Sequence, residues 1–431
     1  MDVVKVKNSF LIPSEKPDRY LFYSPLRSQL FAVSADATPV LRDYLEKGVP
    51  IPERYRLLQD RIDTVFAKEE RSVPPSRMAS GNRLVILLSQ RCNLACEYCF
   101  AHDAHSNEVI DKDTLSTAIQ YVFSNNGSER KRFVFLGGGE PTATWELLTW
   151  AIDQIHEHSN GQEYQISIMT NGTLLTESRI LWLKERNVHV GLSFDILPDV
   201  QDKQRPFPDK SRSSYDKVAE TIGIMLANGL IPGIRSTITP ACVSRMPEMV
   251  EHVHAHFPGI KSVTFEHVTQ DGLEKTDYYD QFYDSFFRAR ELAKQYDIHL
   301  RNSITRAVLF PKERWCSGEL CITPTGTLVA CHRASSVRDP LYDRFLFGSV
   351  DNTVNIDPER VARVSTFSNE KRESCKTCFA YWNCAGVCPN NRASYSDAQF
   401  EALCQFTQKM MRHELETALS AGSADRNPDR E

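Results

Sequence analysis

The chain alternates between two hydrophobic patterns from about Arg83 onward. Short apolar runs, typical of buried strands, alternate with longer segments in which apolar residues recur at helical spacing. The expected strands span 84–89, 133–136, 164–169, 188–194, 231–239 and 262–267. The expected helices span 114–123, 145–155, 177–185, 215–226, 246–256 and 278–296. This order predicts an α/β fold with a parallel sheet and right-handed crossovers, in the form of a partial (β/α)6 barrel.

The regions on either side of this array have different patterns. Before it, strand-like runs at 20–24 and 30–34 precede a helix that we expect Asp36 to cap and Gly48 to end. After about Ile304 the alternation stops, and short strands and turns rich in cysteine follow. We therefore expect a small α/β N-terminal module with its connector (1–82), the barrel (83–303), a cysteine-rich domain (304–412) and a tail with a disordered end (413–431).

Composition excludes several classes of protein. The 431 residues include 51 basic and 56 acidic side chains, and the formal net charge of −5 argues against nucleic-acid binding. No apolar run approaches the ~18 residues that a membrane helix needs. The first residues lack the layout of a secretory signal, so we expect a cytoplasmic protein that binds neither nucleic acid nor membrane.

The cysteines point to metal ligation. The chain has 12 of them, and all except Cys242 fall into two groups, at 92–99 and at 316–404. A reducing cytosol disfavours a disulfide framework, whereas clustered thiols are typical of metal sites.

The first group has the spacing C-x₃-C-x₂-C directly after the first expected strand. Its members are Cys92, Cys96 and Cys99. Three thiolates on one loop can hold three irons of a [4Fe–4S] cluster, and the fourth iron then stays open for a small molecule. The spacing alone also permits a zinc site with a remote fourth ligand, or three structural thiols. A position at the C-terminal end of a barrel strand favours an active site.

The second expected strand ends in Gly137-Gly138-Gly139-Glu140-Pro141-Thr142. Three glycines allow a ligand to approach the main chain, and carbonyl and carboxylate oxygens there can accept hydrogen bonds from an ammonium group. A flexible turn followed by a helix-capping acid is the simpler alternative.

Together the two motifs resemble those of the radical S-adenosylmethionine (SAM) enzymes, over about residues 83–300. The resemblance implies that the three cysteines hold a [4Fe–4S] cluster whose open iron binds SAM, and that the enzyme generates a 5′-deoxyadenosyl radical which abstracts hydrogen from a substrate. The residues that it assigns to the cofactor site are Tyr98, Phe100, Gly138, Gly139, Glu140, Asn171, Ser193, Asp195 and Arg205.

The resemblance also divides the roles within this site. The segment Gly138–Glu140 would bind the amino group of SAM, and Ser193 with Arg205 would serve its carboxylate. Relatives often carry glycine after the Ser-x-Asp segment, but Ile196 stands there in this chain. The loop is therefore expected to differ, and a plain strand-end turn is the alternative for Ser193 and Asp195.

The second cysteine group resembles the SPASM domain, which carries auxiliary [4Fe–4S] clusters. Cys316 and Cys331 frame an expected hairpin turn at Gly326. The resemblance assigns the outer cluster to Cys375, Cys378, Cys384 and Cys404. It assigns the inner cluster to Cys316, Cys331 and Cys388, and Cys321 is the candidate for the fourth ligand. The alternatives are a buried strand residue for Cys321, and zinc in place of iron for the whole domain.

His332 follows Cys331 at a position where sulfatase-maturase-type relatives use an aspartate base. A histidine there can do acid–base chemistry, although a surface histidine is equally compatible with the sequence. The change weakens the case for formylglycine formation. The N-terminal module loosely resembles winged-helix modules that bind leader peptides by strand addition, and a structural cover for the barrel is the alternative.

These observations predict a radical SAM/SPASM maturase with three [4Fe–4S] clusters. Its expected substrate is a ribosomal precursor peptide or protein, which it cross-links or oxidises, and its expected electron donor is a flavodoxin or ferredoxin. The alternatives are a formylglycine-generating oxidase, carbon-skeleton chemistry on a small molecule, and a non-catalytic metal-stabilised binding or electron-transfer protein.

Overall fold

The computed structural model describes residues 3–73, 81–125, 130–210, 212–308, 310–316 and 318–421. The chain divides into two compact units, each assembled from separate stretches of sequence. The barrel unit comprises 77–302 and 316–368, and the second unit comprises 1–76, 303–315 and 369–431.

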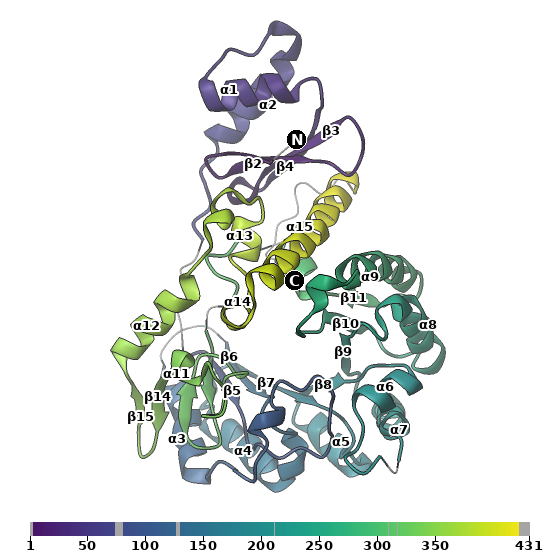
Figure 1. Ribbon diagram of the computed structural model, residues 1–431. Helices are drawn as coiled ribbons and strands as arrows, with labels where there is room; N and C mark the ends of the chain where they lie inside the picture. Colours follow the sequence, from purple (N-terminus) through teal and green to yellow (C-terminus); the bar gives the residue numbers. More distant parts are fainter. Residues whose placement is uncertain are drawn as a thin grey trace. The chain divides into compact units, whose positions relative to one another are not determined.

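The barrel unit is built on seven neighbouring parallel strands with helices on their outer side (Figure 1). The strands are β5 (Arg83–Ile86), β6 (Lys131–Phe135), β7 (Tyr164–Thr170), β8 (His189–Ser193), β9 (Gly233–Ile238), β10 (Ser262–His267) and β11 (His299–Arg301). The main helices are α3 (Lys112–Ser124), α4 (Trp145–His158), α5 (Glu177–Glu185), α6 (Pro198–Gln204), α7 (Ser214–Ala227), α8 (Met246–His256) and α9 (Tyr278–Gln295). The predicted α/β fold with a parallel sheet is present, and β11 is a parallel strand beyond the expected six.

Alternating burial explains why these strands form. In β6, Phe133 and Phe135 are fully buried, whereas Val134 between them is half-buried on the other face. The ring of Phe133 lies 5.1 Å from that of Phe123 on α3. The apolar side of each amphipathic helix thus covers one face of the sheet, as the spacing of apolar residues predicts.

The barrel sheet continues into the region that we expected to form a separate cysteine-rich domain. Strand β12 (Leu320–Ile322) pairs in parallel with β5, and β13 (Thr327–Val329), β14 (Leu346–Val350) and β15 (Val354–Ile356) add antiparallel strands. All three residues of β12 are buried. Because β12 fills the open edge of β5, residues 316–368 belong with the barrel. The remaining short helices of this unit are α11 (Tyr342–Phe345) and α12 (Pro358–Asn369).

The second unit contains an antiparallel sheet in the order β1–β2–β3–β4. Its strands and first helices are β1 (Val4–Val6), β2 (Ser9–Pro13), β3 (Arg19–Ser24), β4 (Gln29–Ser34), α1 (Thr38–Lys47) and α2 (Arg56–Ala67). Strands β1 and β2 were not expected. The prediction that Asp36 caps α1 is wrong, because Ala37 is the N-cap and the Asp36 carboxylate accepts a hydrogen bond from Tyr55 instead, at 2.6 Å.

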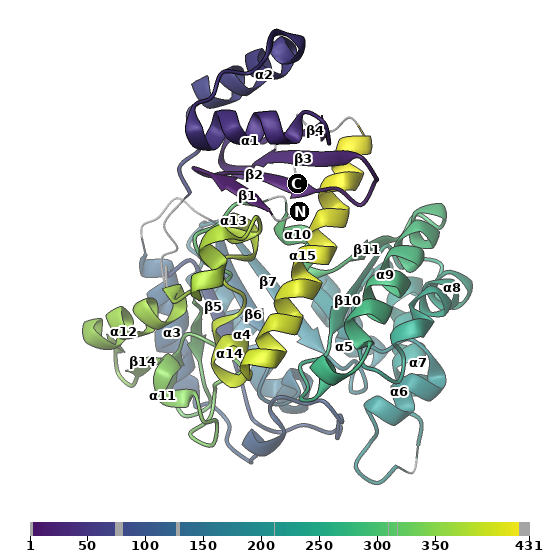
Figure 2. The same cartoon turned by 45° about the horizontal axis from the view of Figure 1, so that its top comes forward.

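Helices from the end of the chain pack on the other side of this sheet from α1 and α2 (Figure 2). They are α10 (Ser303–Ala307), α13 (Tyr381–Cys384), α14 (Pro389–Ser394) and α15 (Asp397–Ser420). A buried hydrogen bond of 2.8 Å joins Tyr23 on β3 to Asn383 on α13, and Arg19 pairs with Glu416 on α15. Helix α15 extends through the first part of the expected tail, and residues 422–431 lie outside the described residues. None of the described helices is long and apolar enough to span a membrane.

Candidate active site

The first cysteine group lies on the loop after β5, where main-chain hydrogen bonds hold it. Ala95 N–H donates to the carbonyl of Pro206 at 2.8 Å, and Glu97 N–H donates to that of Gln204 at 2.9 Å. Both acceptors follow β8. The segment after the fourth barrel strand therefore fixes the loop that carries Cys92, Cys96 and Cys99.

The three thiols are partly shielded from solvent. Burial raises the pKa of Cys92 to about 12 and that of Cys96 to about 11, although nearby Arg205 opposes the shift at Cys96. Burial also raises the pKa of Cys99. Thiols in such surroundings stay protonated until a metal displaces the protons, so they suit ligation rather than nucleophilic chemistry.

The glycines after β6 allow this loop to pack closely. Gly139 N–H donates to the carbonyl of Ser89 at 2.9 Å, and Glu140 N–H donates to that of Arg91 at 2.7 Å. A Cβ atom on Gly139 would lie 1.8 Å from the Arg91 oxygen, far inside van der Waals contact. Gly138 adopts a φ of +62°. The glycines thus allow the cysteine loop to pack closely against the segment after β6. This role is separate from any contact that they make with a ligand.

Glu140 is buried and joins two strand ends. Its carboxylate accepts hydrogen bonds from Thr142 N–H at 3.0 Å, Thr142 O–H at 2.6 Å, Thr170 O–H at 2.5 Å and Asn171 N–H at 2.8 Å. The first three bonds reach Oε1 and only the last reaches Oε2, so acceptor capacity is left on Oε2. Glu140 therefore has a structural role that the sequence did not reveal, and its role toward an amino group stays a prediction.

Asn171 connects the third strand to the cysteine loop through a residue that the sequence analysis missed. Its amide Nδ2 donates to Asn93 Oδ1 at 3.0 Å, and Asn93 donates in turn to Thr173 at 2.8 Å. Asn93 directly follows Cys92. This position next to a predicted ligand was the only feature of the sequence that could have identified Asn93 as a site residue.

Asp195 is the centre of the most connected polar cluster in the site. Its Oδ2 accepts hydrogen bonds from Tyr98 O–H at 2.5 Å, Gln204 at 2.8 Å and Arg205 Nε at 3.0 Å. Its Oδ1 accepts one from Thr237 N–H at 3.0 Å. Asp195 is fully buried. One carboxylate thus ties the cysteine loop to the segment after β8 and to strand β9.

The backbone after Asp195 is strained. Ile196 has a φ of +69°, in the left-handed region that favours glycine, and its side chain is fully buried. The loop that we expected to differ therefore has a backbone conformation that favours glycine, but it carries an isoleucine side chain at this position. Ser193 lies half-buried at the end of β8.

His332 lies beside the first group, next to the end of β6. Its ring centroid is 5.6 Å from that of Phe100, and its ring approaches to 3.6 Å the position that a Cβ on Gly137 would take. Its Nδ1 lies 2.8 Å from Glu319, which also pairs with Arg83 at 3.1 Å. Burial would raise the pKa of Glu319, but His332 and Arg83 outweigh it and lower that pKa to about 2. No motif in the sequence pointed to Glu319.

The second cysteine group is divided between the two units. Cys316, Cys321 and Cys331 belong to the barrel unit, and Cys388 belongs to the second unit. A hydrogen bond of 2.9 Å from Glu319 N–H to the carbonyl of Ala330 closes the β12–β13 hairpin near Cys316 and Cys331. Cys321 is fully buried in an apolar cluster with Val85, Leu87, Val329 and Tyr342. That environment favours the buried-strand interpretation of Cys321.

The four cysteines assigned to the outer cluster line one pocket of the second unit. They are Cys375, Cys378, Cys384 and Cys404. Within the described residues, no three His, Cys, Asp or Glu side chains are arranged to bind a single metal ion. A [4Fe–4S] cluster does not need such convergence, because each thiolate binds a different iron. Four thiols around one pocket therefore fit a cluster better than a lone zinc.

The comparisons with known proteins agree with this site. Residues 86–253 match the Radical SAM superfamily. The chain therefore carries a radical SAM domain over these residues. This family implies that SAM binds together with a [4Fe–4S] cluster. The loop thiols at 92–99, held against the Gly138–Glu140 segment, are the residues that fit these groups.

Two relatives and one solved structure illustrate what this chain is similar to. The cysteine-type anaerobic sulfatase-maturating enzyme of Clostridium novyi is 32% identical over 156 residues, which are 34% of this chain and 41% of that protein. The radical SAM cyclopropyl synthase TigE of Paramaledivibacter caminithermalis is 20% identical over 395 residues, which are 82% and 77% of the two chains. The structure of native anSMEcpe with bound AdoMet and Kp18Cys peptide has a TM-score of 0.65 at 19% identity and covers 78% of this chain and 99% of that one. This last likeness shows a shared fold.

Proposed function

We propose that this enzyme is a maturase that uses SAM to modify a ribosomally made peptide or protein by cross-linking or oxidising a residue. The observation that carries the proposal is the cysteine loop, which packs against Gly139 and is tied to Asp195 through Tyr98. The anSMEcpe structure holds both AdoMet and a peptide, and TigE is named as a cyclopropyl synthase. The peptide in the first supports a peptide substrate.

The side chains of this site hold and orient the cofactors. When bound, the cluster and SAM supply a 5′-deoxyadenosyl radical, which takes a hydrogen atom from the substrate. Cys92, Cys96 and Cys99 would hold the cluster, and the main chain at Gly138–Glu140 would accept hydrogen bonds from the SAM amino group. Arg205, which lies beside Cys96, attracts the SAM carboxylate together with Ser193.

The second cysteine group would supply two auxiliary clusters. Cys375, Cys378, Cys384 and Cys404 surround one pocket and would hold the outer cluster. Cys316, Cys331 and Cys388 remain the ligands proposed for the inner one. If Cys321 is a core residue, the inner cluster has three cysteine ligands and one iron free for substrate. These clusters would accept the electron that remains after hydrogen abstraction.

His332 is the candidate acid or base. Glu319 holds its Nδ1 at 2.8 Å, which orients the other ring nitrogen, Nε2, for proton transfer. The resemblance to sulfatase-maturating enzymes makes a Ser- or Cys-oxidising activity the second candidate. A short peptide with one Cys or Ser separates the two functions, because formylglycine can form on it without a cross-linking partner residue.

The N-terminal sheet has two candidate roles. Strand β1 is an edge strand and offers main-chain groups for a leader peptide. One face of the sheet packs on the helices near the outer cysteines, through the hydrogen bond between Tyr23 and Asn383. This packing favours a structural role for the sheet.

The deciding experiment is anaerobic reconstitution followed by iron and sulfide analysis and an assay for 5′-deoxyadenosine. Three clusters give about twelve irons and twelve sulfides per chain. Cys96→Ala is expected to lose about four irons and all 5′-deoxyadenosine formation while staying folded. The control is Cys242→Ala, which removes the cysteine outside both groups and should retain both. Turnover by Cys96→Ala, or zinc without iron in the wild type, contradicts the proposal.

A further inference from the structure

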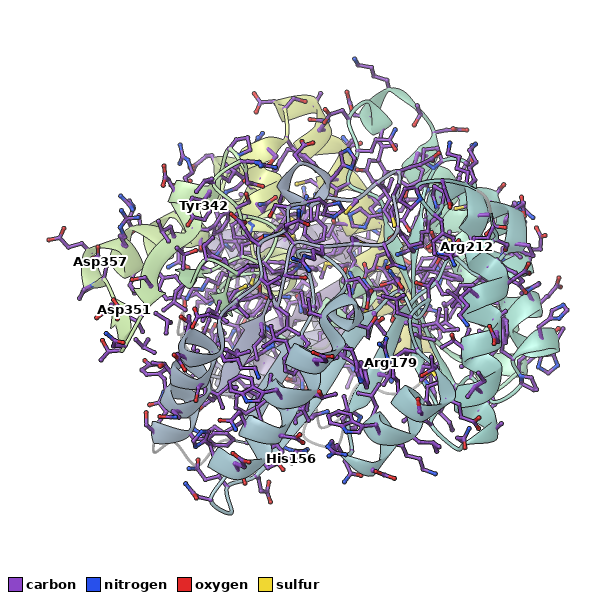
Figure 3. All side chains as sticks on the ribbon, turned by 90° about the horizontal axis from the view of Figure 1, so that it is seen from below. His156, Arg179, Arg212, Tyr342, Asp351 and Asp357 are labelled. Carbon is purple, nitrogen blue, oxygen red and sulfur yellow. The ribbon has the colours of Figure 1, made fainter. Side chains whose placement is uncertain are left out.

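A pocket of about 660 Å³ lies against the inner face of the barrel sheet, across β6, β7, β8 and β9. We call it the inner pocket. Fully buried residues alternate with half-buried ones along β6 and β7, and the half-buried Val134, Ser167 and Met169 line the pocket. The helices cover the opposite face of these strands, and His156 of α4 and Arg179 of α5 are labelled on that helical side in Figure 3.

The inner pocket is continuous with the segments that are expected to bind the cofactors. Leu136 lines the pocket and directly precedes the segment 137–140. Met169 also lines it and is followed by Thr170, whose hydroxyl donates a hydrogen bond to Glu140. The wall of the pocket therefore leads along two neighbouring strands to the place where SAM is expected to bind.

Two glycines make room on the inner face. Gly191 of β8 and Gly233 of β9 are paired in register, and both line the pocket. A Cβ atom on Gly191 would lie 2.7 Å from Cε and 3.1 Å from Sδ of Met169. Around a Cβ atom on Gly233, no described atom beyond its chain neighbours lies within 4 Å. The glycine pair thus leaves open space beside a thioether, as strand glycines do where a ligand approaches closely.

The walls of the inner pocket favour an uncharged group. Met169 and Leu230 contribute apolar side chains, and Ile231 adds one that is 56% exposed. Among the described lining residues there is no carboxylate, and Lys184 is the one permanent cation. Its ammonium donates a hydrogen bond to the carbonyl of Asn228 at 2.7 Å, so part of its hydrogen-bonding capacity is used within the chain.

Three of the lining groups suit an aromatic ring in particular. The thioether of Met169 makes favourable contacts with the edge of a ring. The ammonium of Lys184 is attracted to the face of a ring, and the imidazole of His189 can stack on one. An aliphatic side chain of similar size would gain from burial alone.

We propose that the inner pocket holds an aromatic side chain of the substrate peptide, next to the residue that loses hydrogen. The inference rests on the proposed function and names its substrate class, a peptide with Phe, Tyr or Trp beside the modified residue. Gly191 and Gly233 are then specificity-determining residues, because a side chain at either position takes up the space of the ring.

The test uses capped amino acids as probes of the reconstituted chain, in the presence of saturating SAM. The probes are N-acetyl-L-tryptophanamide, N-acetyl-L-leucinamide and the α-amide of N-acetyl-L-glutamate, and saturation-transfer NMR measures their binding. We expect the tryptophan probe to bind most tightly and the glutamate probe most weakly. In Gly233→Leu, the dissociation constant of the tryptophan probe should rise by about tenfold or more, because the new side chain fills the pocket.

A matched variant separates the pocket from a general effect of added bulk. Gly223→Leu introduces the same side chain on α7, where a Cβ atom also meets open space, and should keep the wild-type affinity. The iron content of Gly233→Leu shows whether this variant is folded. Ile231→Asp changes an exposed position that carries little risk for folding, and it should weaken binding of the tryptophan probe by about threefold.

Several results would overturn the aromatic subsite. They are equal binding of the three probes, a preference for leucine or glutamate, and unchanged affinity in both Gly233→Leu and Ile231→Asp. Equal losses in Gly233→Leu and Gly223→Leu would do the same. Competition between the tryptophan probe and SAM would assign the pocket to the cofactor instead. A wild-type chain that binds the probe but makes no 5′-deoxyadenosine with dithionite as reductant contradicts the proposed function.

Discussion

The two cysteine groups are held in different ways. The first group lies on a loop fixed by polar contacts to neighbouring strand ends, including the main-chain hydrogen bonds from Gly139 and Glu140 and the bond from Tyr98 to the buried Asp195. The four outer cysteines of the second group line a pocket whose other walls include Phe400 and Val387. A loop held by the protein's own hydrogen bonds is preorganised for its ligand, whereas thiols around a pocket depend more on the metal for their arrangement.

Gly139→Ala should have the largest effect, because it disrupts the close packing that preorganises the cysteine loop. The added methyl would meet the Arg91 carbonyl at 1.8 Å and push the cysteine loop away. We expect loss of the SAM-binding cluster, and with it 5′-deoxyadenosine formation, but retention of the outer cluster, as measured by iron content and electron paramagnetic resonance. Gly223→Ala is the control, because no atom lies within 4 Å of the new methyl. Loss of the outer cluster as well would show that the two groups are not independent.

Asp195→Ala is expected to destabilise the barrel by about 3–5 kcal/mol. It removes the acceptor for Tyr98 and leaves the nearly buried Arg205 without its carboxylate partner. Denaturant unfolding measures the change. Asp153→Ala breaks an exposed ion pair with Arg186 and should cost at most about 1 kcal/mol. Similar losses of unfolding free energy in the two variants would mean that the Asp195 cluster does not stabilise the site.

Acid should weaken the barrel unit through His267. Burial, and then the positive charges of Arg235 and Arg333, lower the pKa of His267 to about 4. In the unfolded chain this histidine titrates near 6.5, so between pH 6.5 and 4 the unfolded state binds more protons. Stability is therefore complete above pH 6.5 and falls by up to about 1.4 kcal/mol per pH unit below it. Denaturant unfolding at several pH values should show a shallower dependence in His267→Gln, and an unchanged slope contradicts the assignment.

Cys321→Val should have the smallest effect. A valine of similar size fits the apolar cluster of Val85 and Val329, so we expect a loss of less than about 1.5 kcal/mol and a full complement of iron. Cys331→Val, which removes a proposed inner ligand, is the matched comparison and should lower the iron content. Equal loss of iron in both variants would identify Cys321 as the fourth inner ligand instead of a core residue.

Local sequence patterns were enough to predict the order of the barrel elements and a metal-binding role for the first loop. Strand and helix periodicities are local properties. Of the six expected barrel helices, α4, α5, α8 and α9 therefore begin at the expected residue, and α3 and α7 begin within two residues of it. Cysteine spacing is equally local, because three ligands on one loop need no distant partner. The family resemblance followed from these two features.

Tertiary structure decided which side chains meet across strand ends. The contact between Gly139 and Arg91 and the bond from Tyr98 to Asp195 join residues far apart in sequence. The support of His332 by Glu319 crosses the β12–β13 hairpin. They depend on strand register, which no local pattern records. The same reason explains the addition of β12 to the barrel sheet, since a three-residue buried strand is visible only once β5 offers it an edge.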